Sequence, residues 1–252
     1  MKTYLIDLDG TMYKGNTIID GALDFLQRIR EHGDRYLFLT NNATRTGKQN
    51  VEHMEKLGFY GLNPEDFFTS SMAAARYIAK KSSKRNAFFV GKDGLREALL
   101  DSGFTITDKD VDFVFVGLDK DGSYQTYSYA LKFLLNGAKL VGTNSDRLLA
   151  KDDGFNIGNG SIVAMFEYAT GQESEKIGKP YQPILDEVLE YASITKEEAI
   201  LVGDNLETEI KLGVDFGVKT IFVTSGVHDR KDIERLKIIP NQVVNSLNDI
   251  EM

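Results

Sequence analysis

The chain has 252 residues, of which 42% are hydrophobic and 27% charged, and it contains no cysteine. This composition is typical of a soluble globular protein with one or two domains, and it excludes disulfides, thiolate metal sites and cysteine nucleophiles. The net charge of −8 argues against a broad surface for nucleic acid or for an anionic membrane. We find no secretory signal and no apolar run of about 18 residues, so we expect a cytoplasmic protein without a membrane segment.

Apolar runs of strand length alternate with amphipathic segments of helix length. In chain order we expect strand 4–8, helix 21–32, strand 36–40, helix 46–57, helix 71–81, strand 87–90, helix 95–102, strand 111–116, helix 127–136, strand 139–142, helix 161–170, helix 180–191, strand 200–203, helix 208–216 and strand 220–223. The alternation predicts an α/β protein with a mainly parallel sheet. In such sheets ligands bind beyond the carboxyl ends of the strands, so residues at strand ends are the first candidates for a site.

The first expected strand ends in Asp7-Leu8-Asp9-Gly10-Thr11. The simplest interpretation is a polar exit from the strand with a turn at Gly10. Alternation along an extended chain also places Asp7 and Asp9 on the same side, where two like charges are costly unless a cation lies between them. Mg²⁺ prefers such oxygen ligands. One acid can then attack as a nucleophile while the other transfers a proton.

Two further segments offer groups that bind anions. The strand 36–40 ends in Thr40, Asn41 and Asn42, which carry one hydroxyl and two amides. These residues also suit a helix cap and turn, but the Thr40 hydroxyl and nearby backbone N–H groups can hold an anion. Lys179 stands at the expected start of a helix, where its charge suits a phosphate, although a lone lysine is often only a solvated side chain.

A fourth strand end, at residues 200–203, leads into Asp204, Glu207 and Glu209. These acids could merely favour the positive end of a helix. In the functional interpretation, Asp204 is a third ligand for a hard cation. Glu209 then either binds the cation or orients the ligands around it. Together the four segments supply the groups for a dianion, a divalent cation and a carboxylate nucleophile. Phosphoryl transfer is the chemistry that best fits this set.

The four segments resemble the four motifs of the haloacid dehalogenase (HAD) superfamily in order and in context. About 30 residues separate Asp9 from Thr40, and about 140 separate Thr40 from Lys179. Only the second interval has room for an inserted domain. An insert at this position resembles the type IIA, or NagD-like, branch of the superfamily. The insert supports this assignment with cap-like segments at residues 112–119, 140–147 and 158–171.

The resemblance implies a Rossmann-like HAD core with a mainly parallel sheet. It also implies an inserted α/β cap domain of the C2 cap class, subclass A. The catalytic core would comprise residues 1–78 and 177–252. The cap, which would govern substrate specificity, would comprise residues 79–176. Members of this branch include dimers formed through the cap, so a homodimer is one expectation, with no interface identified.

The resemblance also assigns a role to each motif residue. Asp7 would attack phosphorus and become an aspartyl phosphate. Asp9 would protonate the leaving oxygen and then activate water, while its backbone carbonyl faces Mg²⁺. Thr40 and the Asn41 amide would hold the phosphoryl oxygens, and Lys179 would neutralise them together with Asp7.

The fourth motif completes the implied site and contains a departure from the family. Asp204 would join Asp7 and Asp9 as a protein ligand of Mg²⁺, and Asn205 would lie near the phosphate. The family usually has an aspartate where Glu209 stands. Because the longer side chain can act through water, Glu209 is left out of the direct ligand set.

We therefore expect a Mg²⁺-dependent phosphatase of a small phosphorylated metabolite, such as a nucleoside monophosphate or a sugar phosphate, with p-nitrophenyl phosphate as a substrate in vitro. Within the cap, Asn144, Asp146 and Arg147 are candidates for contacts with the leaving group. Asn144 and Asp146 are also good turn formers, which favours a role in structuring a loop.

Three alternatives use the same residues differently. A phosphotransferase or phosphomutase would pass the phosphoryl group from the aspartyl phosphate to a hydroxyl instead of water. A phosphate-sensing module that resembles a receiver domain would be about half as long and would lack the insert. A non-catalytic phosphate-binding protein would be favoured by loss of Asp7, Asp9, Lys179 or Asp204, all of which are present.

Overall fold

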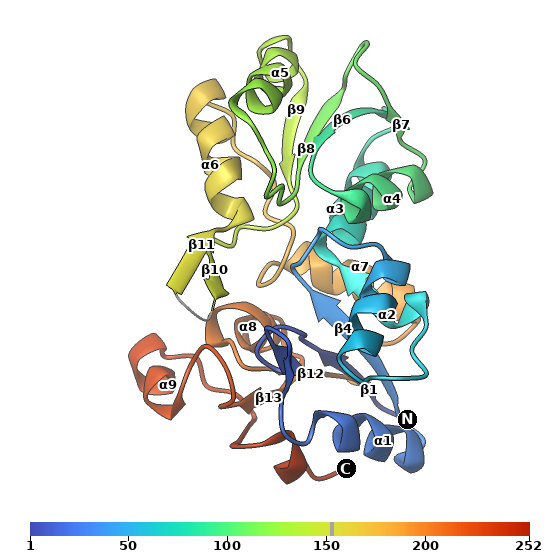
Figure 1. Cartoon of the computed structure of the whole chain (residues 1–252), viewed down its shortest axis with the longest axis vertical. Helices are drawn as coiled ribbons and strands as arrows, with labels where there is room; N and C mark the ends of the chain where they lie inside the picture. The colour runs from blue at the N-terminus through green and yellow to red at the C-terminus, as the bar shows by residue number, and fades with distance from the viewer. Residues whose placement is uncertain (152–153) are drawn as a thin grey trace. The chain divides into compact units, whose positions relative to one another are not determined.

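The computed structural model describes residues 1–151 and 154–252, and the chain divides into two compact units (Figure 1). The first unit comprises Met1–Thr40, Asn50–Phe68 and Val188–Met252, and the second comprises Asn41–Gln49 and Thr69–Glu187. Each unit has its own sheet of mainly parallel strands, which confirms the expected α/β class. The domain boundaries expected at residues 79 and 176 stay a prediction.

The first unit is organised around a sheet with the strand order β14-β13-β12-β1-β4-β5. Its strands are β1 (Thr3–Ile6), β4 (Arg35–Thr40), β5 (Phe67–Thr69), β12 (Ala199–Gly203), β13 (Lys219–Val223) and β14 (Gln242–Val244). The central strands run parallel, and Ile6 of β1 lies opposite Val202 of β12 on one side and Phe38 of β4 on the other. This register brings the ends of three expected strands to the same edge of the sheet.

The other elements of the first unit are helices, turns and short strands. They are β2 (Tyr13–Lys14), β3 (Thr17–Ile18), α1 (Ala22–His32), α2 (Gly47–Lys56), a 3₁₀ turn (Pro64–Asp66), α7 (Gln182–Ala192), a π-helical turn (Leu206–Ile210), α8 (Lys211–Phe216), α9 (Arg230–Leu236) and a 3₁₀ turn (Leu247–Asp249). One boundary between the units lies directly after β4, and the others fall inside α2, β5 and α7. The α1 helix buries Phe25 edge-on against Tyr4 of β1, with ring centroids 5.5 Å apart. Burial of such a side chain contributes about 1.5–3 kcal/mol, so contacts of this kind hold the helices on the sheet.

The second unit has a sheet with the strand order β7-β6-β8-β9 and parallel pairing. Its elements are α3 (Ser70–Lys81), β6 (Asn86–Val90), α4 (Asp93–Asp101), β7 (Thr105–Ile106), β8 (Phe113–Val116), α5 (Tyr124–Leu135), β9 (Lys139–Gly142), the antiparallel pair β10 (Leu148–Lys151) and β11 (Gly154–Ile157), and α6 (Asn159–Thr170). A separate hydrophobic core joins β8 and β9 to α5 and α6. Each unit therefore has its own apolar interior.

Every strand and helix expected from the sequence overlaps an observed element, and the boundaries differ by a few residues. The helix expected at 127–136 begins earlier because Ser123 caps it, accepting a hydrogen bond of 3.1 Å from Thr126 N–H. The helix expected at 180–191 begins at Gln182, because the chain first makes a turn in which Tyr181 N–H bonds to the Gly178 carbonyl. The sequence did not predict the short strands β2, β3, β5 and β7, the β10–β11 hairpin, α9 or β14.

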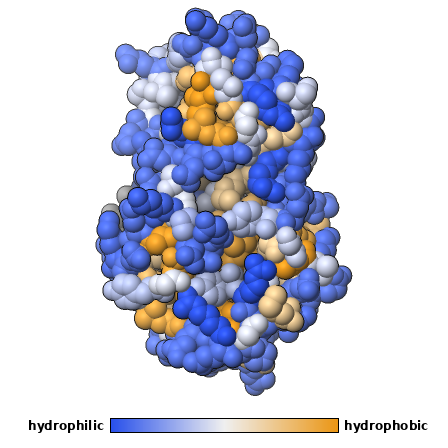
Figure 2. Space-filling model, turned by 90° about the vertical axis from the view of Figure 1, so that its right-hand side faces the viewer, coloured by the Kyte–Doolittle hydropathy of each residue, from blue (hydrophilic) through white to orange (hydrophobic). Residues whose placement is uncertain are grey.

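The surface agrees with the composition. Figure 2 shows hydrophilic residues over most of the visible face of each unit, with hydrophobic residues in separate patches. None of the described helices combines the length and the apolar character needed to span a bilayer.

Candidate active site

A cluster of three acids lies at the carboxyl end of the sheet in the first unit. Carboxylate oxygens of Asp7, Asp204 and Glu209 lie within 4.8 Å of one another. The strand register explains this, because Asp7 N–H bonds to the Val202 carbonyl at 2.9 Å, and Asp204 follows two residues later. The structure thus brings together two of the acids expected to bind metal and adds Glu209.

The Asp204 carboxylate is buried and oriented by two donors. Its side chain is fully covered, with 0% exposure. The Thr11 hydroxyl donates to Oδ1 at 2.8 Å, and Val227 N–H donates to Oδ2 at 2.7 Å. Burial, reinforced by the negative charge of Glu209, raises the pKa of Asp204 to about 6. A cation in this cluster would favour the ionised form.

Glu209 is placed by the π-helical turn that follows β12. Its carboxylate is also buried and accepts hydrogen bonds from Asn205 N–H at 2.8 Å and from the Thr208 hydroxyl at 2.7 Å. A Cβ on Gly203 would lie 2.2 Å from Glu209 Cγ, so only glycine leaves room for this side chain. The single residue that a π-helix adds to a turn redirects the side chain, and the sequence pattern of an ordinary helix does not show it.

Two glycines allow the backbone to approach Asp204 closely. Gly10 has φ +96°, and a Cβ there would lie 2.3 Å from Asp204 Oδ2. A Cβ on Gly226 would lie 1.9 Å from the same oxygen. Gly10 was expected as a turn residue, whereas Gly226 was missed because it lies far away in the sequence, after β13. Both positions require glycine for the Asp204 carboxylate to keep its place.

The Asp9 side chain is exposed, unlike those of Asp204 and Glu209, and it is not part of the acidic cluster. The backbone after it turns back, with Gly10 N–H bonded to the Tyr13 carbonyl at 2.8 Å. Exposure suits a carboxyl group that exchanges protons with substrate and water. Its expected roles in proton transfer and, through its carbonyl, in metal binding stay predictions.

Thr40, Asn41 and Lys179 are all buried. Thr40 ends β4 in the first unit, and the second unit begins at Asn41. Within the second unit, the Asn41 side chain accepts a hydrogen bond from Lys179 N–H at 2.8 Å and donates one to the Lys179 carbonyl at 3.0 Å. The structure therefore brings the Asn41 side chain into contact with the main chain of Lys179, and local sequence pattern does not indicate this contact.

Asn205 and the cap candidates have structural contacts. The Asn205 side-chain oxygen caps the π-helical turn by accepting from Glu207 N–H at 2.9 Å, and its expected place near a phosphate stays a prediction. Asn144 is buried, donates to the Asn41 carbonyl at 2.8 Å and accepts from Asp146 N–H at 3.2 Å, which fits the loop-structuring interpretation. The Arg147 side chain is exposed, and contact with a leaving group stays open for it.

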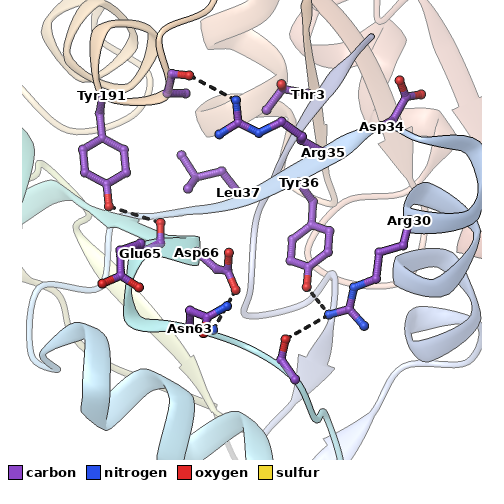
Figure 3. A pocket seen from close by; sticks show the side chains of 12 residues that line it. Thr3, Arg30, Asp34, Arg35, Tyr36, Leu37, Asn63, Glu65, Asp66 and Tyr191 are labelled. Carbon is purple, nitrogen blue, oxygen red and sulfur yellow. Dashed lines mark hydrogen bonds between the residues drawn. The ribbon is translucent and has the colours of Figure 1, made fainter.

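A pocket of about 470 Å³ lies at the amino-terminal ends of strands β1 and β4, away from the carboxyl ends that carry the acidic cluster (Figure 3). It is lined by residues that begin β1 and β4, such as Thr3 and Arg35, whereas Asp7 follows the end of β1 and Thr40 is the last residue of β4. Its charged lining residues are of both signs: Arg30, Asp34, Arg35, Glu65 and Asp66. This mixed pocket is not part of the acidic cluster, and its charges favour no single class of ligand.

Comparisons with known proteins agree with this geometry. The sequence model of the haloacid dehalogenase-like hydrolases matches residues 4–105, and a second model, described as HAD-hydrolase-like, matches residues 176–250. The acid sugar phosphatase of Staphylococcus epidermidis is 38% identical over 248 residues, which cover 98% of this chain and 95% of that protein. The corresponding protein of Staphylococcus aureus strain MRSA252 is 36% identical over 249 residues, with coverage of 98% and 96%.

Solved structures show the same relationship. NagD from Escherichia coli K-12 superposes with a TM-score of 0.90 at 32% identity and covers 100% of this chain and 98% of its own. A mutant of the thermostable NPPase from Geobacillus stearothermophilus has a TM-score of 0.90 at 37% identity, with coverage of 100% and 99%. The order of motifs, the buried acids at the sheet edge and these relatives lead to one assignment. The chain belongs to the NagD-like, type IIA branch of the haloacid dehalogenase superfamily, and it is a phosphatase.

Proposed function

We propose that this phosphatase is Mg²⁺-dependent and hydrolyses a small phosphorylated metabolite through an aspartyl phosphate on Asp7. The observation that carries the proposal is the cluster of Asp7, Asp204 and Glu209, whose carboxylate oxygens lie within 4.8 Å of one another. Two of these acids are almost completely buried. Like charges in such a place need a cation, and an all-oxygen donor set suits a hard divalent ion.

The proposed metal ligands are Asp7, Asp204 and the backbone carbonyl of Asp9. Glu209 reaches the same cluster, so we add it as a residue that either binds the ion or orients its shell. When bound, Mg²⁺ would neutralise part of the charge on the phosphoryl group and on the acids. Thr11 and Val227 support the site by holding the two oxygens of Asp204.

The proposed reaction has two steps. In the first, a carboxylate oxygen of Asp7 forms a bond to phosphorus while the bond from phosphorus to the ester oxygen breaks, and Asp9 gives its proton to that oxygen. In the second, Asp9 takes a proton from water, whose oxygen bonds to phosphorus as the bond to Asp7 breaks. The products are the alcohol, inorganic phosphate and the original carboxylate of Asp7.

The remaining motif residues would bind the phosphoryl group through both steps. The Thr40 hydroxyl and the backbone N–H of Asn41 would donate hydrogen bonds to its oxygens. Lys179 would neutralise its negative charge, and Asn205 would lie beside it. These donors act most strongly where water is excluded, and a cap domain at residues 79–176 would exclude it.

The names of the relatives support a substrate class. The names of the relatives include acid sugar phosphatase and p-nitrophenyl phosphatase. We therefore propose small phosphate monoesters, with sugar phosphates first, nucleoside monophosphates second and p-nitrophenyl phosphate as the assay substrate. We also keep the cytoplasmic location and the homodimer as proposals, which fractionation and sedimentation would test.

The experiment is phosphate release from a panel of these esters by the wild type and by Asp7→Asn, with Mg²⁺ and with EDTA. Turnover that needs the metal and is lost in Asp7→Asn is the expected result. Asp24→Asn is the matched control, because Asp24 is an exposed acid of α1. Metal-independent turnover, or full activity of Asp7→Asn, would refute the mechanism. Transfer of phosphate to an added alcohol without release would replace hydrolysis by phosphotransfer.

A further inference from the structure

The Asn41 side chain holds the main chain of Lys179 at two points. Its Oδ1 accepts a hydrogen bond of 2.8 Å from Lys179 N–H, and its Nδ2 donates one of 3.0 Å to the Lys179 carbonyl. The second Nδ2 hydrogen serves Asp146, whose Oδ1 lies 2.9 Å away. A side-chain amide has only two hydrogens to donate. Both are committed, so this side chain is occupied with protein groups.

The loop that carries Lys179 depends on this contact for its position. Residues 177–181 belong to no helix or strand. A Cβ on Gly178 would lie 2.8 Å from Asn41 Oδ1 and 2.8 Å from Asn144 Cβ, so the loop packs directly on these side chains. Two hydrogen bonds to one residue's backbone, on both sides of its Cα, restrict the direction in which its side chain leaves the main chain.

Asn41 is itself held firmly. Its backbone carbonyl accepts hydrogen bonds from the Ser70 hydroxyl at 2.7 Å and from Asn144 Nδ2 at 2.8 Å. Ser70 begins α3, and Asn144 follows β9, and both side chains are buried. Ser70 and Asn144 therefore hold Asn41 in place, and Asn41 in turn holds the main chain of Lys179.

We propose that Asn41 is a positioning residue that acts through Lys179, rather than a side chain that binds the phosphoryl group. This inference rests on the proposed function, in which Lys179 neutralises the phosphoryl group. It leaves only the backbone N–H of Asn41 for a phosphoryl oxygen. Charge stabilisation requires that the lysine stay in place, since a displacement of about 1 Å in a catalytic group can cost a factor on the order of 100 in rate.

The test is a double-mutant cycle between Asn41→Ala and Lys179→Met. Alanine keeps the backbone N–H of residue 41 and removes only the side-chain amide. If the amide acts through Lys179, Asn41→Ala lowers kcat/KM about 10–100-fold in the wild type and less than about 3-fold when Lys179 is already methionine. The same cycle, measured as the Kd for inorganic phosphate in the presence of Mg²⁺, covers variants whose turnover is too slow.

Gln172→Ala is the matched control. The Gln172 side chain holds backbone in the same way, accepting from Leu140 N–H and donating to the Ala138 carbonyl, both at 3.0 Å, in the same unit. Its loss should lower the melting temperature while changing kcat/KM by less than about 2-fold, because Lys179 is not among its contacts. If Asn41→Ala does not fold, Asn41→Asp replaces it, since aspartate keeps the shape and loses both donors.

Each outcome decides between explanations. The positioning role would be overturned if Asn41→Ala lowered kcat/KM by the same factor in the Lys179→Met background as in the wild type. It would also be overturned if Asn41→Ala did not lower kcat/KM at all. A loss from Gln172→Ala as large as that from Asn41→Ala would reduce it to general stability. Full activity of Lys179→Met would refute the proposed function of the lysine, which is a separate failure.

Discussion

The Thr11 hydroxyl donates a hydrogen bond of 2.8 Å to Oδ1 of Asp204, across 193 residues of sequence. Both side chains are fully buried. The bond joins the loop after β1 to the loop after β12, the two neighbouring strands that deliver Asp7 and Asp204 to the acidic cluster. It leaves the Asp204 oxygens oriented by protein donors on both sides.

Thr11→Val should weaken the response to Mg²⁺, because valine has nearly the same shape but cannot donate to Asp204. We expect the Mg²⁺ concentration for half-maximal activity to rise about 10-fold, since partners of metal ligands typically affect metal affinity 10–100-fold. Thr11→Ser keeps the hydroxyl and should stay near the wild type. Equal Mg²⁺ titrations of Thr11→Val and the wild type would remove this role from Thr11.

Glu209→Gln should lower Mg²⁺ affinity more than the substitution of a neighbouring acid. Its carboxylate is buried in the cluster, so loss of the charge should cost about 10–100-fold in affinity. Glu207→Gln is the control, because the Glu207 side chain is 55% exposed. Calorimetric titration with Mg²⁺ measures both variants. Similar affinities for the two would show that Glu209 is outside the metal site.

Gly10→Ala should abolish Mg²⁺-dependent activity. The new Cβ would lie 2.3 Å from Asp204 Oδ2 and would displace this carboxylate. Gly33→Ala is a matched control, because Gly33 has a similar positive φ, +80°, with open space around it. Gly33→Ala should cost about 1–2 kcal/mol of stability, from backbone strain alone, and keep its activity. Activity assays and thermal unfolding would be measured for both variants. Mg²⁺-dependent activity in Gly10→Ala would contradict the prediction.

Without metal, the stability of the protein should fall as the pH rises through about 6. The pKa of Asp204 is raised from 3.8 to about 6 in the folded chain, so the folded state binds this proton more tightly than the unfolded state. The contribution is present below about pH 4 and is lost by about pH 6, and it is on the order of 2–3 kcal/mol.

The measurement is the melting temperature of the wild type and of Asp204→Asn in EDTA from pH 4 to pH 7. Asparagine stays neutral, so the variant should gain on the wild type as the pH rises. Saturating Mg²⁺ should reduce or reverse this gain by binding the ionised wild type. A difference between the two proteins that does not change with pH would contradict the raised pKa.

The sequence predicted the fold class and much of the site because parallel strands impose a simple rule. Acids that directly follow β1 and β12 must come together when these strands are neighbours, and Asp7 and Asp204 do so. The sequence named Glu209 as a residue that binds the cation or orients its shell, but local pattern could not decide whether its carboxylate reaches the other acids, because that depends on the π-helical turn. Nor could it predict the approach of Gly226, since tertiary packing alone brings this residue to Asp204.

Other elements were missed because their signals are short or irregular. The strand β14 has three residues, and the β10 and β11 strands have four each. The α9 helix has seven residues and buries none of them completely, so it lacks a strong apolar pattern. The Asn41 contact joins residues that are 138 positions apart, and its neighbours in the sequence suggested only a cap or an anion site.

The central claim is that Asp7 becomes phosphorylated during turnover, and the most direct test is to trap that intermediate. The enzyme is mixed with a phosphate ester and Mg²⁺ and quenched in acid within the first turnover. Borohydride then reduces an aspartyl phosphate to homoserine with loss of phosphate, and mass spectrometry locates the changed residue. The account predicts that Asp7 is the modified residue, and that neither Asp7→Asn nor the wild type in EDTA carries the modification. Modification of Asp9 or Thr40, or rapid turnover with no modified residue, would contradict it.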